Sequence, residues 1–493
     1  MPINHDLTFG PVETQRLFGH EAAENEAPER LKEYYFKNIT YQDVTAPLGL
    51  RILVGHKGIG KSALFKIAIM EDRQNSELPI LIRPDDIAEL GKDTTDFLLT
   101  VRSWKDGLKK IIAAKALSEF GLDQTGATRA LQTSAARVVD FLAETLRERL
   151  KIDTSLGKNA LISQFLKNNR IKVYIDDLDR GWEGSKDDVR RISALLNAAR
   201  DLLNESPNLF IKIGLRSDVY YLVRTSDEST DKIEGSVVWQ RWRNHEILVL
   251  LVKRVETFFG RAVDESRLLG LKQYDLSQYL SGIMSSTFQG EGHWANAPTY
   301  RVIMSLIRKW PRYLVKLCTL AAKDAFQSRK NIIGTANFRN IFTEYSEGRI
   351  QDTINEYRSE LPDIERLVMA MKPSKREKTT KEGYVYSSDA LLQKIRNIRQ
   401  GGNFRFAGRR ETTDATDKEL AAFLYKVNFL TARKELADGT ILRRFFEESR
   451  YLSSILVDFG FDWEVHPAYR WALQPDSIET IFAQLKLTSD DER

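Results

Sequence analysis

Short apolar runs alternate along the chain with longer stretches whose apolar residues recur every three to four positions. The runs that predict buried strands cover residues 50–54, 78–83, 173–175, 209–215 and 246–252. The clearest helical stretch lies between 187 and 203, with an apolar face formed by Val189, Ile192, Leu196, Ala199 and Leu203. Strands that alternate with helices favour a parallel sheet covered on both faces. The pattern therefore predicts an α/β fold.

The segment after the first strand carries a G-x-x-x-x-G-K-S motif, the signature of a P-loop NTPase. Its glycines allow backbone N–H groups to point inward at phosphate oxygens. Lys61 would reach the β- and γ-phosphates, and the Ser62 hydroxyl would ligate Mg²⁺. The strand and helix on either side disfavour a plain glycine-rich turn. The residues expected to hold a nucleotide are Gly55, His56, Lys57, Gly58, Ile59, Gly60, Lys61, Ser62 and Ala63.

A second element of such a site is an acidic group at the end of another buried strand. The segment 175–180, Ile-Asp-Asp-Leu-Asp-Arg, follows the apolar run 173–175. Ligands bind at the carboxyl ends of strands in open α/β sheets. We expect Asp176 to bind Mg²⁺ and Asp177 to act as the general base that polarises water. The alternative is a strand that ends in a solvated acidic turn.

These two motifs, with Gly-Leu-Arg-Ser-Asp at 214–218 and Trp-Pro-Arg-Tyr-Leu at 310–314, resemble the additional-strand P-loop ATPases. They look most like the KAP and STAND-like groups and related stand-alone bacterial ATPases. The resemblance covers roughly residues 20–330. It implies that the strand 209–215 lies between the loop strand and the aspartate strand. It also implies ATP as the nucleotide and a role as a switch or scaffold, in several relatives within anti-phage defence.

The resemblance also assigns arginines. Arg216 stands where the family senses the γ-phosphate, with a surface salt bridge as the alternative. Arg312 resembles the lid arginine that contacts nucleotide, although an arginine at a helix start explains it nearly as well. Arg180 would serve a neighbouring subunit as an arginine finger, or would pair with Asp177 or Asp179.

Changes in composition divide the chain further. Residues 95–170 form a mostly helical insertion, either a cap or oligomer face or a helix pair packed locally on the sheet. The predicted parts are an N-terminal helical extension (1–45), an ATPase core (46–265), a helical lid (266–370), a linker or loop (371–386) and a winged-helix-like domain (387–493).

The last part shows two helices, 388–398 and 417–428, followed by arms that flank Asp438-Gly439, a strong hairpin signal. A strand and turn at 463–469 would close this winged-helix-like domain. The segment 394–410 mixes basic and aromatic residues, which indicates a sequence-independent nucleic-acid contact. A solvated loop is the alternative. Its members are Lys394, Arg396, Arg399, Phe404, Arg405, Phe406, Arg409 and Arg410.

Bulk composition narrows the class of protein. A chain of 493 residues is too long for one core, and 29% charged residues argue against disorder. A net charge of +5 does not by itself predict nucleic acid. A single cysteine excludes a disulfide framework and suits the cytoplasm. We expect no signal peptide and no membrane span, and the histidines and cysteine lack metal-ligand spacing.

Three functions remain open. The first is an ATP-driven conformational switch with weak basal hydrolysis, acting as a homo-oligomer. An effector protein partner is expected because the chain carries no evident nuclease, protease or TIR-like constellation. The second is a DNA-binding ATPase that uses the winged-helix-like domain. The third is a scaffold that binds nucleotide structurally, which the complete set of Lys61, Ser62, Asp176 and Asp177 disfavours.

Overall fold

The computed structural model divides the chain into two compact units. We call Ala27–Lys32 with Lys37–Gln240 the sheet unit, and Met1–Glu26, Glu33–Phe36 and Arg241–Arg493 the C-terminal unit. The structure describes residues 7–22, 25–91, 96–122, 138–152, 165–226, 228–290, 292–374, 377, 383–407, 413–453, 460–474, 481 and 485–490. Each unit is described by itself below.

The sheet unit is built on five parallel strands in the order β2-β3-β4-β1-β5. Their bounds are β1 Leu50–Val54, β2 Leu78–Ile82, β3 Ile171–Ile175, β4 Leu209–Leu215 and β5 Val237–Trp239. Because β4 lies between β1 and β3, the predicted strand order is confirmed. The predicted parallel α/β sheet is confirmed as well.

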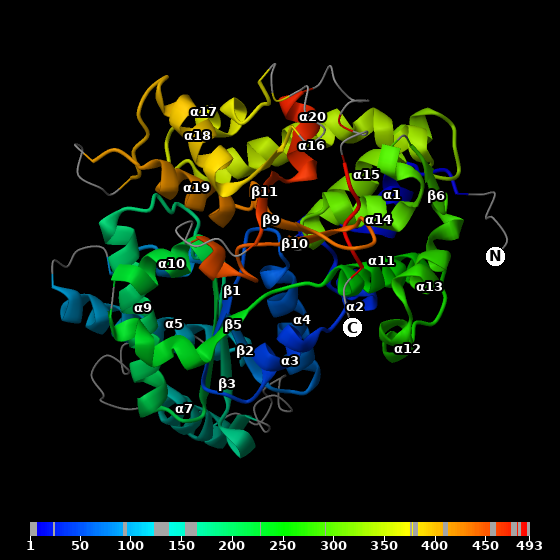
Figure 1. Cartoon of the computed structure of the whole chain (residues 1–493). Helices are drawn as coiled ribbons and strands as arrows, with labels where there is room; N and C mark the ends of the chain where they lie inside the picture. Colours follow the sequence, from blue (N-terminus) through cyan, green and yellow to red (C-terminus); the bar gives the residue numbers. More distant parts are fainter. Residues whose placement is uncertain are drawn as a thin grey trace. The chain divides into compact units, whose positions relative to one another are not determined.

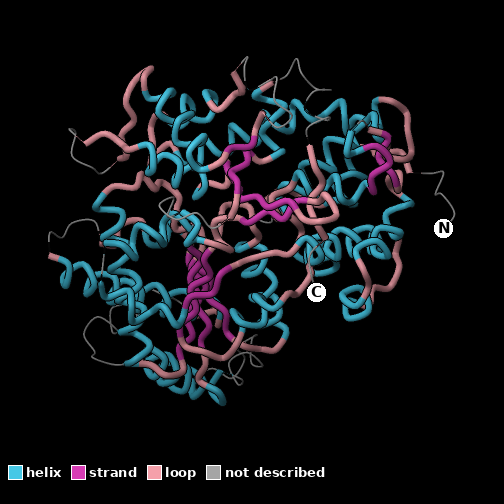
Figure 2. Tube along the Cα trace, in the orientation of Figure 1, coloured by secondary structure: helices cyan, strands magenta, loops and turns pink. Residues whose placement is uncertain are grey.

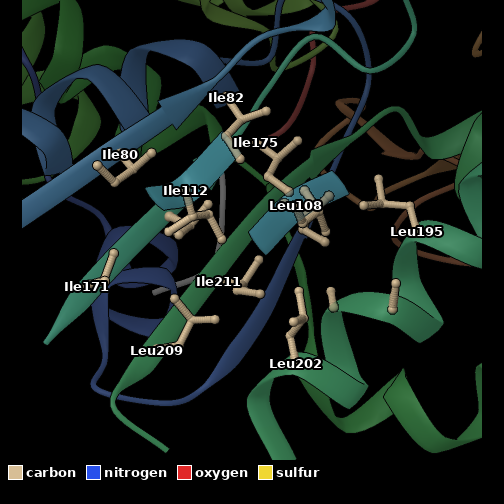
Figure 3. Close-up of a cluster of buried hydrophobic side chains, with 14 of the residues drawn as sticks. Ile80, Ile82, Leu108, Ile112, Ile171, Ile175, Leu195, Leu202, Leu209 and Ile211 are labelled. Atoms are coloured by element: carbon tan, nitrogen blue, oxygen red, sulfur yellow. The ribbon is translucent and has the colours of Figure 1, made fainter. Parts of the chain in front are cut away.

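Helices cover both faces of this sheet (Figure 1). Helices α3 Ile39–Thr45 and α4 Lys61–Gln74 pack on one face, and α9 Lys186–Glu205 packs on the other. Isoleucine and leucine side chains from β2, β3 and β4 meet those of α9, together with Leu108 and Ile112, in a core on one face of the sheet (Figure 3). In the α9 face, Ile192, Leu196 and Ala199 are buried, as the spacing predicted.

The insertion contributes α5 Phe97–Glu119 and α7 Val138–Ile152. Helix α5 packs against α9, α7 and β2. The apolar stripes of both helices belong to the core of the sheet, with Trp104, Leu108, Ile112, Leu142 and Leu146 all buried. Of the two alternatives for these helices, the structure shows local packing on the sheet. Residues 123–137 and 153–164 of the predicted insertion lie outside the described residues.

The predicted strand at 246–252 is wrong. This segment lies inside helix α11 Asn244–Phe258, and the fifth strand of the sheet is β5 instead. Helix α11 is buried on nearly every side, including Ile247, Leu250 and Val252. In a helix that is apolar on every side, the sequence no longer shows apolar residues every 3.6 positions. A short apolar run in such a helix therefore looks the same as a buried strand.

The C-terminal unit is mainly helical before residue 371 (Figure 2). Helix α1 Pro11–Phe18 packs against α11 and against α15 Pro311–Gln327, and α15 packs against α16 Thr335–Tyr357. Its smaller elements are α12 Glu265–Gly270, α13 Gln273–Ser277, β6 Thr287–Gln289, β7 Ala295–Pro298, α14 Thr299–Leu306 and α17 Ile364–Ala370.

An antiparallel sheet of order β10-β9-β11-β8 follows. The elements are β8 Val385–Tyr386, α18 Ser388–Arg399, α19 Asp417–Lys426, β9 Leu430–Glu435, β10 Ile441–Arg444 and β11 Asp462–Val465. The two helices and the hairpin around Asp438-Gly439 are confirmed, with Gly439 at a φ of 77°. The closing strand is β11, and it pairs with β9 and β8.

Within the described residues, no helix combines the length and apolar content needed to cross a bilayer.

Candidate nucleotide site

The loop of residues 55–60 joins β1 to α4 through a turn that requires glycine. Gly58 and Gly60 have φ angles of 82° and 108°, in the left-handed region that L side chains rarely adopt. Gly60 is the N-cap of α4, and no side chain caps that helix. A 14-residue helix that begins this way presents N–H groups and the positive end of its dipole to an anion.

Lys61 is the first residue of α4, and its side chain folds back over the loop. Its Nζ donates to the carbonyl oxygens of Gly55 at 2.8 Å and His56 at 3.1 Å. The ammonium therefore lies at the mouth of the loop, where phosphate oxygens would take the place of these carbonyls. Its predicted contact with the β- and γ-phosphates stays a prediction.

Asp176 and Ser62 lie together across the sheet. Asp176 directly follows β3, and the Ser62 hydroxyl donates a hydrogen bond to its carboxylate. Burial raises the pKa of Asp176, while the Ser62 hydrogen bond and the Lys61 ammonium act in the opposite direction. The two residues predicted to hold Mg²⁺ are thus brought together, and the cationic side chain of the loop is near them.

Gly214 makes room for this carboxylate. It lies in β4, paired with Leu53 of β1. A Cβ at Gly214 would lie 2.9 Å from Asp176 Oδ1 and 3.2 Å from Phe65 Cε2, closer than side chains tolerate. Gly214 was not among the site residues predicted from the sequence. Its place in the Gly-Leu-Arg-Ser-Asp segment was the available signal.

The strand order and the loop together decide the fold. The β1 loop opens onto α4, the β3 aspartate meets the loop serine, and β4 separates the two strands. The chain has the fold of a P-loop NTPase. The P-loop is residues 55–62, and the acidic segment is residues 176–179.

Asp177 adopts an unusual conformation for the predicted general base. Its φ is 62°, and its carboxylate forms an ion pair with Arg180 at 2.8 Å. Both side chains are largely exposed. Among the alternatives for Arg180, the structure shows the pair with Asp177. The role of Asp177 toward water stays a prediction.

Arg216 links the ends of β3 and β4. It donates to both carboxylate oxygens of Asp218, at 3.0 and 2.6 Å, and lies 3.3 Å from Asp179. Only 9% of its side chain is exposed, so it is not a surface salt bridge. The sequence analysis did not assign Asp218, and it named Asp179 only as a partner for Arg180.

Arg312 lies in the C-terminal unit, in the first turn of α15 after Pro311. Its Nε donates to the Glu21 carbonyl oxygen at 3.3 Å, and Lys316 one turn later pairs with the Glu21 carboxylate at 3.1 Å. Both contacts lie within that unit. The predicted contact of Arg312 with nucleotide stays a prediction.

A magnesium ion would find a hydroxyl and a carboxylate at this site. Among the described residues, no group of three or more histidine, cysteine, aspartate or glutamate side chains could hold a metal ion. Mg²⁺ at nucleotide sites takes one or two carboxylates together with substrate phosphates and water. The pair of Ser62 and Asp176 fits that donor set.

The basic segment 394–410 is largely neutralised by neighbouring acids. Arg396 and Arg399 both pair with Asp417, at 3.2 and 2.7 Å. Arg405 pairs with Asp414, Lys394 pairs with Glu377, and Phe404 is fully buried. Arg409 and Arg410 lie outside the described residues. A nucleic-acid contact here stays a prediction, and the ion pairs and buried Phe404 of the described part also differ from the solvated loop of the alternative.

Comparisons with known proteins add remote likenesses. No family model matches the chain. An 80.3 kDa protein named for transposon gamma-delta in Escherichia coli (strain K12) is 21% identical, over 94% of this chain and 69% of its own length. A Walker-type ATPase of Pyrococcus abyssi is 15% identical with a TM-score of 0.37, over 92% of this chain and 97% of its own.

The ORC2 protein of Aeropyrum pernix, solved with ADPNP and ADP, is 12% identical with a TM-score of 0.38, over 87% of this chain and 91% of its own. Values this low carry no argument about function. The fold assignment rests on the strand order and the loop themselves.

Proposed function

We propose that this P-loop NTPase binds ATP with Mg²⁺ and hydrolyses it slowly, as a conformational switch. The observation that carries the proposal is the contact between Ser62 and Asp176, in the space that Gly214 leaves open. Lys61 adds a positive charge at the mouth of the same loop. Hydroxyl, carboxylate and ammonium are the groups that a metal–triphosphate complex requires of a protein.

Each residue has a definite task in this proposal. The P-loop N–H groups and Lys61 bind the phosphates, and the Ser62 hydroxyl turns from Asp176 toward the metal. Ser62 and Asp176 would hold Mg²⁺, which would supply positive charge to the reacting phosphates. Asp177 would orient the attacking water and accept its proton.

Slow turnover follows from two features of Asp177. Aspartate is one methylene shorter than the glutamate that many ATPases of this broad class carry as the base. Asp177 is also paired with Arg180, so its carboxylate must exchange that partner before it can act on water. Both features suit a switch better than a motor.

The switch is proposed to act through Arg216. Its guanidinium binds Asp179 in the acidic segment and Asp218 at the start of α10 Ser217–Ser226. A γ-phosphate near Arg216 would compete with these carboxylates and so would move both segments. Homo-oligomer formation, an effector protein partner and a place in the KAP or STAND-like group, with its defence association, belong to the same proposal.

Phosphate release by the purified chain tests this function. With ATP and Mg²⁺ we expect a slow, saturable release that is lost in Asp176→Asn. We also expect ATP to change the mass distribution or the protease cleavage pattern of the wild type. No phosphate release above the level of Asp176→Asn would refute hydrolysis, and identical mass and cleavage with and without ATP would refute the switch.

A further inference from the structure

A cavity of about 310 Å³ lies in the sheet unit beside the acidic segment. We call it the β2–β3 pocket, because its walls follow the carboxyl ends of those two strands. It is bounded by the turn η2 Pro84–Ile87, by α5, by residues 178–181 and by the first half of α9. Its volume is at the lower end of the range for small-molecule sites. The insertion helix α5 is therefore part of a pocket at the edge of the sheet where ligands bind in α/β folds.

The walls of the pocket combine apolar side chains with charged ones. Ile87, Leu178 and Ile192 line it, and Trp104 stands behind them in the wall. Trp104 is fully buried, and its Nε1 lies against Gly91, where an added Cβ would be 2.6 Å away. The indole is therefore part of the wall and is covered by the chain.

Arg191 gives the pocket a partly buried positive charge. Its Nε donates to the Leu90 carbonyl at 2.9 Å, and its Nη2 donates to the Ile87 carbonyl at 2.7 Å. The guanidinium carbon lies 5.5 Å from the Trp104 ring centre. No carboxylate of the described residues lies within ion-pair distance of it.

Acids act on Arg191 only from farther away. Burial lowers the pKa of Arg191, while Asp188 and Glu89 oppose this from beyond ion-pair range. Asp85, the one acid among the lining residues that the structure describes, is exposed. The pocket therefore combines apolar side chains with a guanidinium whose charge is compensated by carbonyl dipoles and not by a contacting anion of the described residues.

We propose that the β2–β3 pocket binds a small anion with a flat apolar body, such as an aromatic carboxylate. The apolar body lies against the aliphatic walls formed by Ile87, Leu178 and Ile192. The anionic group lies at the guanidinium of Arg191. A neutral ligand of the same shape gains the apolar contacts but leaves the guanidinium without an anion, so charge decides affinity.

The pocket also reaches the proposed general base. Arg180 lines the pocket and pairs with Asp177. An anion that contacts Arg180 as well as Arg191 competes with Asp177 for the Arg180 guanidinium and so weakens the Asp177–Arg180 pair. This coupling rests on the proposed function, whereas binding to the pocket does not. The Asp177–Arg180 pair is exposed and weak, so an anion of modest affinity is enough to shift it.

Binding is tested without nucleotide, with indole-3-acetate as the probe and the uncharged indole-3-acetamide as its match. We expect calorimetry to find one site for indole-3-acetate and a roughly tenfold to hundredfold weaker affinity for indole-3-acetamide. Ala88→Phe fills the cavity and leaves both arginines in place, and it is expected to abolish binding of both probes. Equal affinity for the two probes, no binding of either, or unchanged binding by Ala88→Phe overturns the proposal.

Arg191 also holds the turn after β2, so its replacement is paired with a stability control. Arg191→Lys keeps the charge and is expected to bind indole-3-acetate more tightly than Arg191→Gln does. The comparison is made between variants with equal melting temperatures. Equal binding by these two variants contradicts the role of the positive charge.

Turnover separates the pocket from the coupling. With ATP and Mg²⁺, saturating indole-3-acetate is expected to raise phosphate release by the wild type severalfold. Indole-3-acetate is expected not to change phosphate release by Arg180→Ala or by Ala88→Phe. If indole-3-acetate binds but does not change turnover, the coupling to Asp177 is wrong and the proposal of a binding pocket is unaffected. Absence of turnover in every sample refutes the proposed function, and the calorimetry then decides the pocket alone.

Discussion

Two carboxylates in this chain are placed among cations, and their pKa values move in opposite directions. Burial raises the pKa of Glu464 in β11, but Arg443 and Arg470 outweigh it and bring the pKa to about 2. Arg443 Nε lies 2.9 Å from Glu464, and Arg470 binds the same carboxylate. For Asp176, burial outweighs the Ser62 hydrogen bond and the Lys61 charge, and its pKa is raised.

The difference separates a carboxylate that stabilises the fold from one that is prepared for a ligand. Glu464 has its cations within the chain and is fully compensated. Asp176 has a hydroxyl and a more distant ammonium, so its ionised form gains when a further cation arrives. This comparison adds to the contact with Ser62, on which the placement of Mg²⁺ at Asp176 rests, and substitutions at either carboxylate test it.

The largest effect on stability is expected from Glu464→Gln. It leaves two arginines buried without their carboxylate, so we expect a loss of about 3–5 kcal/mol in the free energy of unfolding. Chemical denaturation measures it. The matched control is Glu435→Gln, whose side chain is 48% exposed in its pair with Lys486 and should change stability by less than about 1 kcal/mol. Equal losses in the two variants would mean that burial of Glu464 does not matter.

The largest effect on function is expected from Lys61→Ala. Loss of the ammonium should reduce ATP turnover at least about a hundredfold, because it removes the charge that the transferring phosphoryl group needs. Lys323→Ala, an exposed lysine of α15 outside the loop, should stay within about threefold of the wild type. Turnover that survives in Lys61→Ala would leave the loop without its proposed role.

Gly214→Ala places a methyl group against Asp176. The methyl carbon would lie 2.9 Å from Oδ1, so we expect a loss of about 1–3 kcal/mol in stability and roughly a tenfold fall in turnover. Gly235→Ala is the control, since a Cβ there meets nothing within 4 Å. If Gly214→Ala behaves like its control, the close approach of β4 to the carboxylate is unimportant.

The smallest effect is a dependence on pH with opposite signs at the two sites. Glu464 has a folded pKa below its ordinary value of 4.5, so its stabilisation is present above about pH 4.5 and is lost as pH falls toward 2. The stability advantage of wild type over Glu464→Gln should shrink by about 1 kcal/mol between pH 7 and pH 4.

Asp176 should behave in the reverse sense. Its folded pKa is raised, so its contribution is present at low pH and is lost as pH rises through the folded value. Asp176→Asn should therefore gain stability relative to wild type between pH 4 and pH 7. Denaturation at the two pH values measures both differences, and equal signs for the two sites would contradict the comparison.

Much of the sheet unit could be predicted because local pattern and chemistry agree there. The strand β4 matches its predicted bounds, since its apolar run ends directly at a charged segment, and the resemblance supplied its place between β1 and β3. The segment 246–252 failed because burial on all sides removes the period that marks a helix. The meeting of Ser62 with Asp176 followed from the motifs alone.

Other features of the site were predicted only as alternatives or not at all. The pair of Asp177 with Arg180 was one of two alternatives, and the structure adds the left-handed turn that brings it about. The ion pair of Arg216 with Asp218 depends on how α10 begins, and the sequence did not predict it. The β2–β3 pocket exists only because α5 returns to the sheet from an insertion whose position the sequence left open.

The most direct test of the central claim is calorimetry of ATP binding with Mg²⁺, repeated from pH 4 to pH 7 in two buffers of different ionisation enthalpy. The pKa of Asp176 is raised and a cation next to it should ionise that carboxyl group, so we predict one bound ATP per chain and release of protons on binding in the acidic part of this range. Proton release should be smaller in Asp176→Asn. Absence of ATP binding, or the same proton release in Asp176→Asn as in wild type, would contradict a metal–triphosphate site built on this carboxylate.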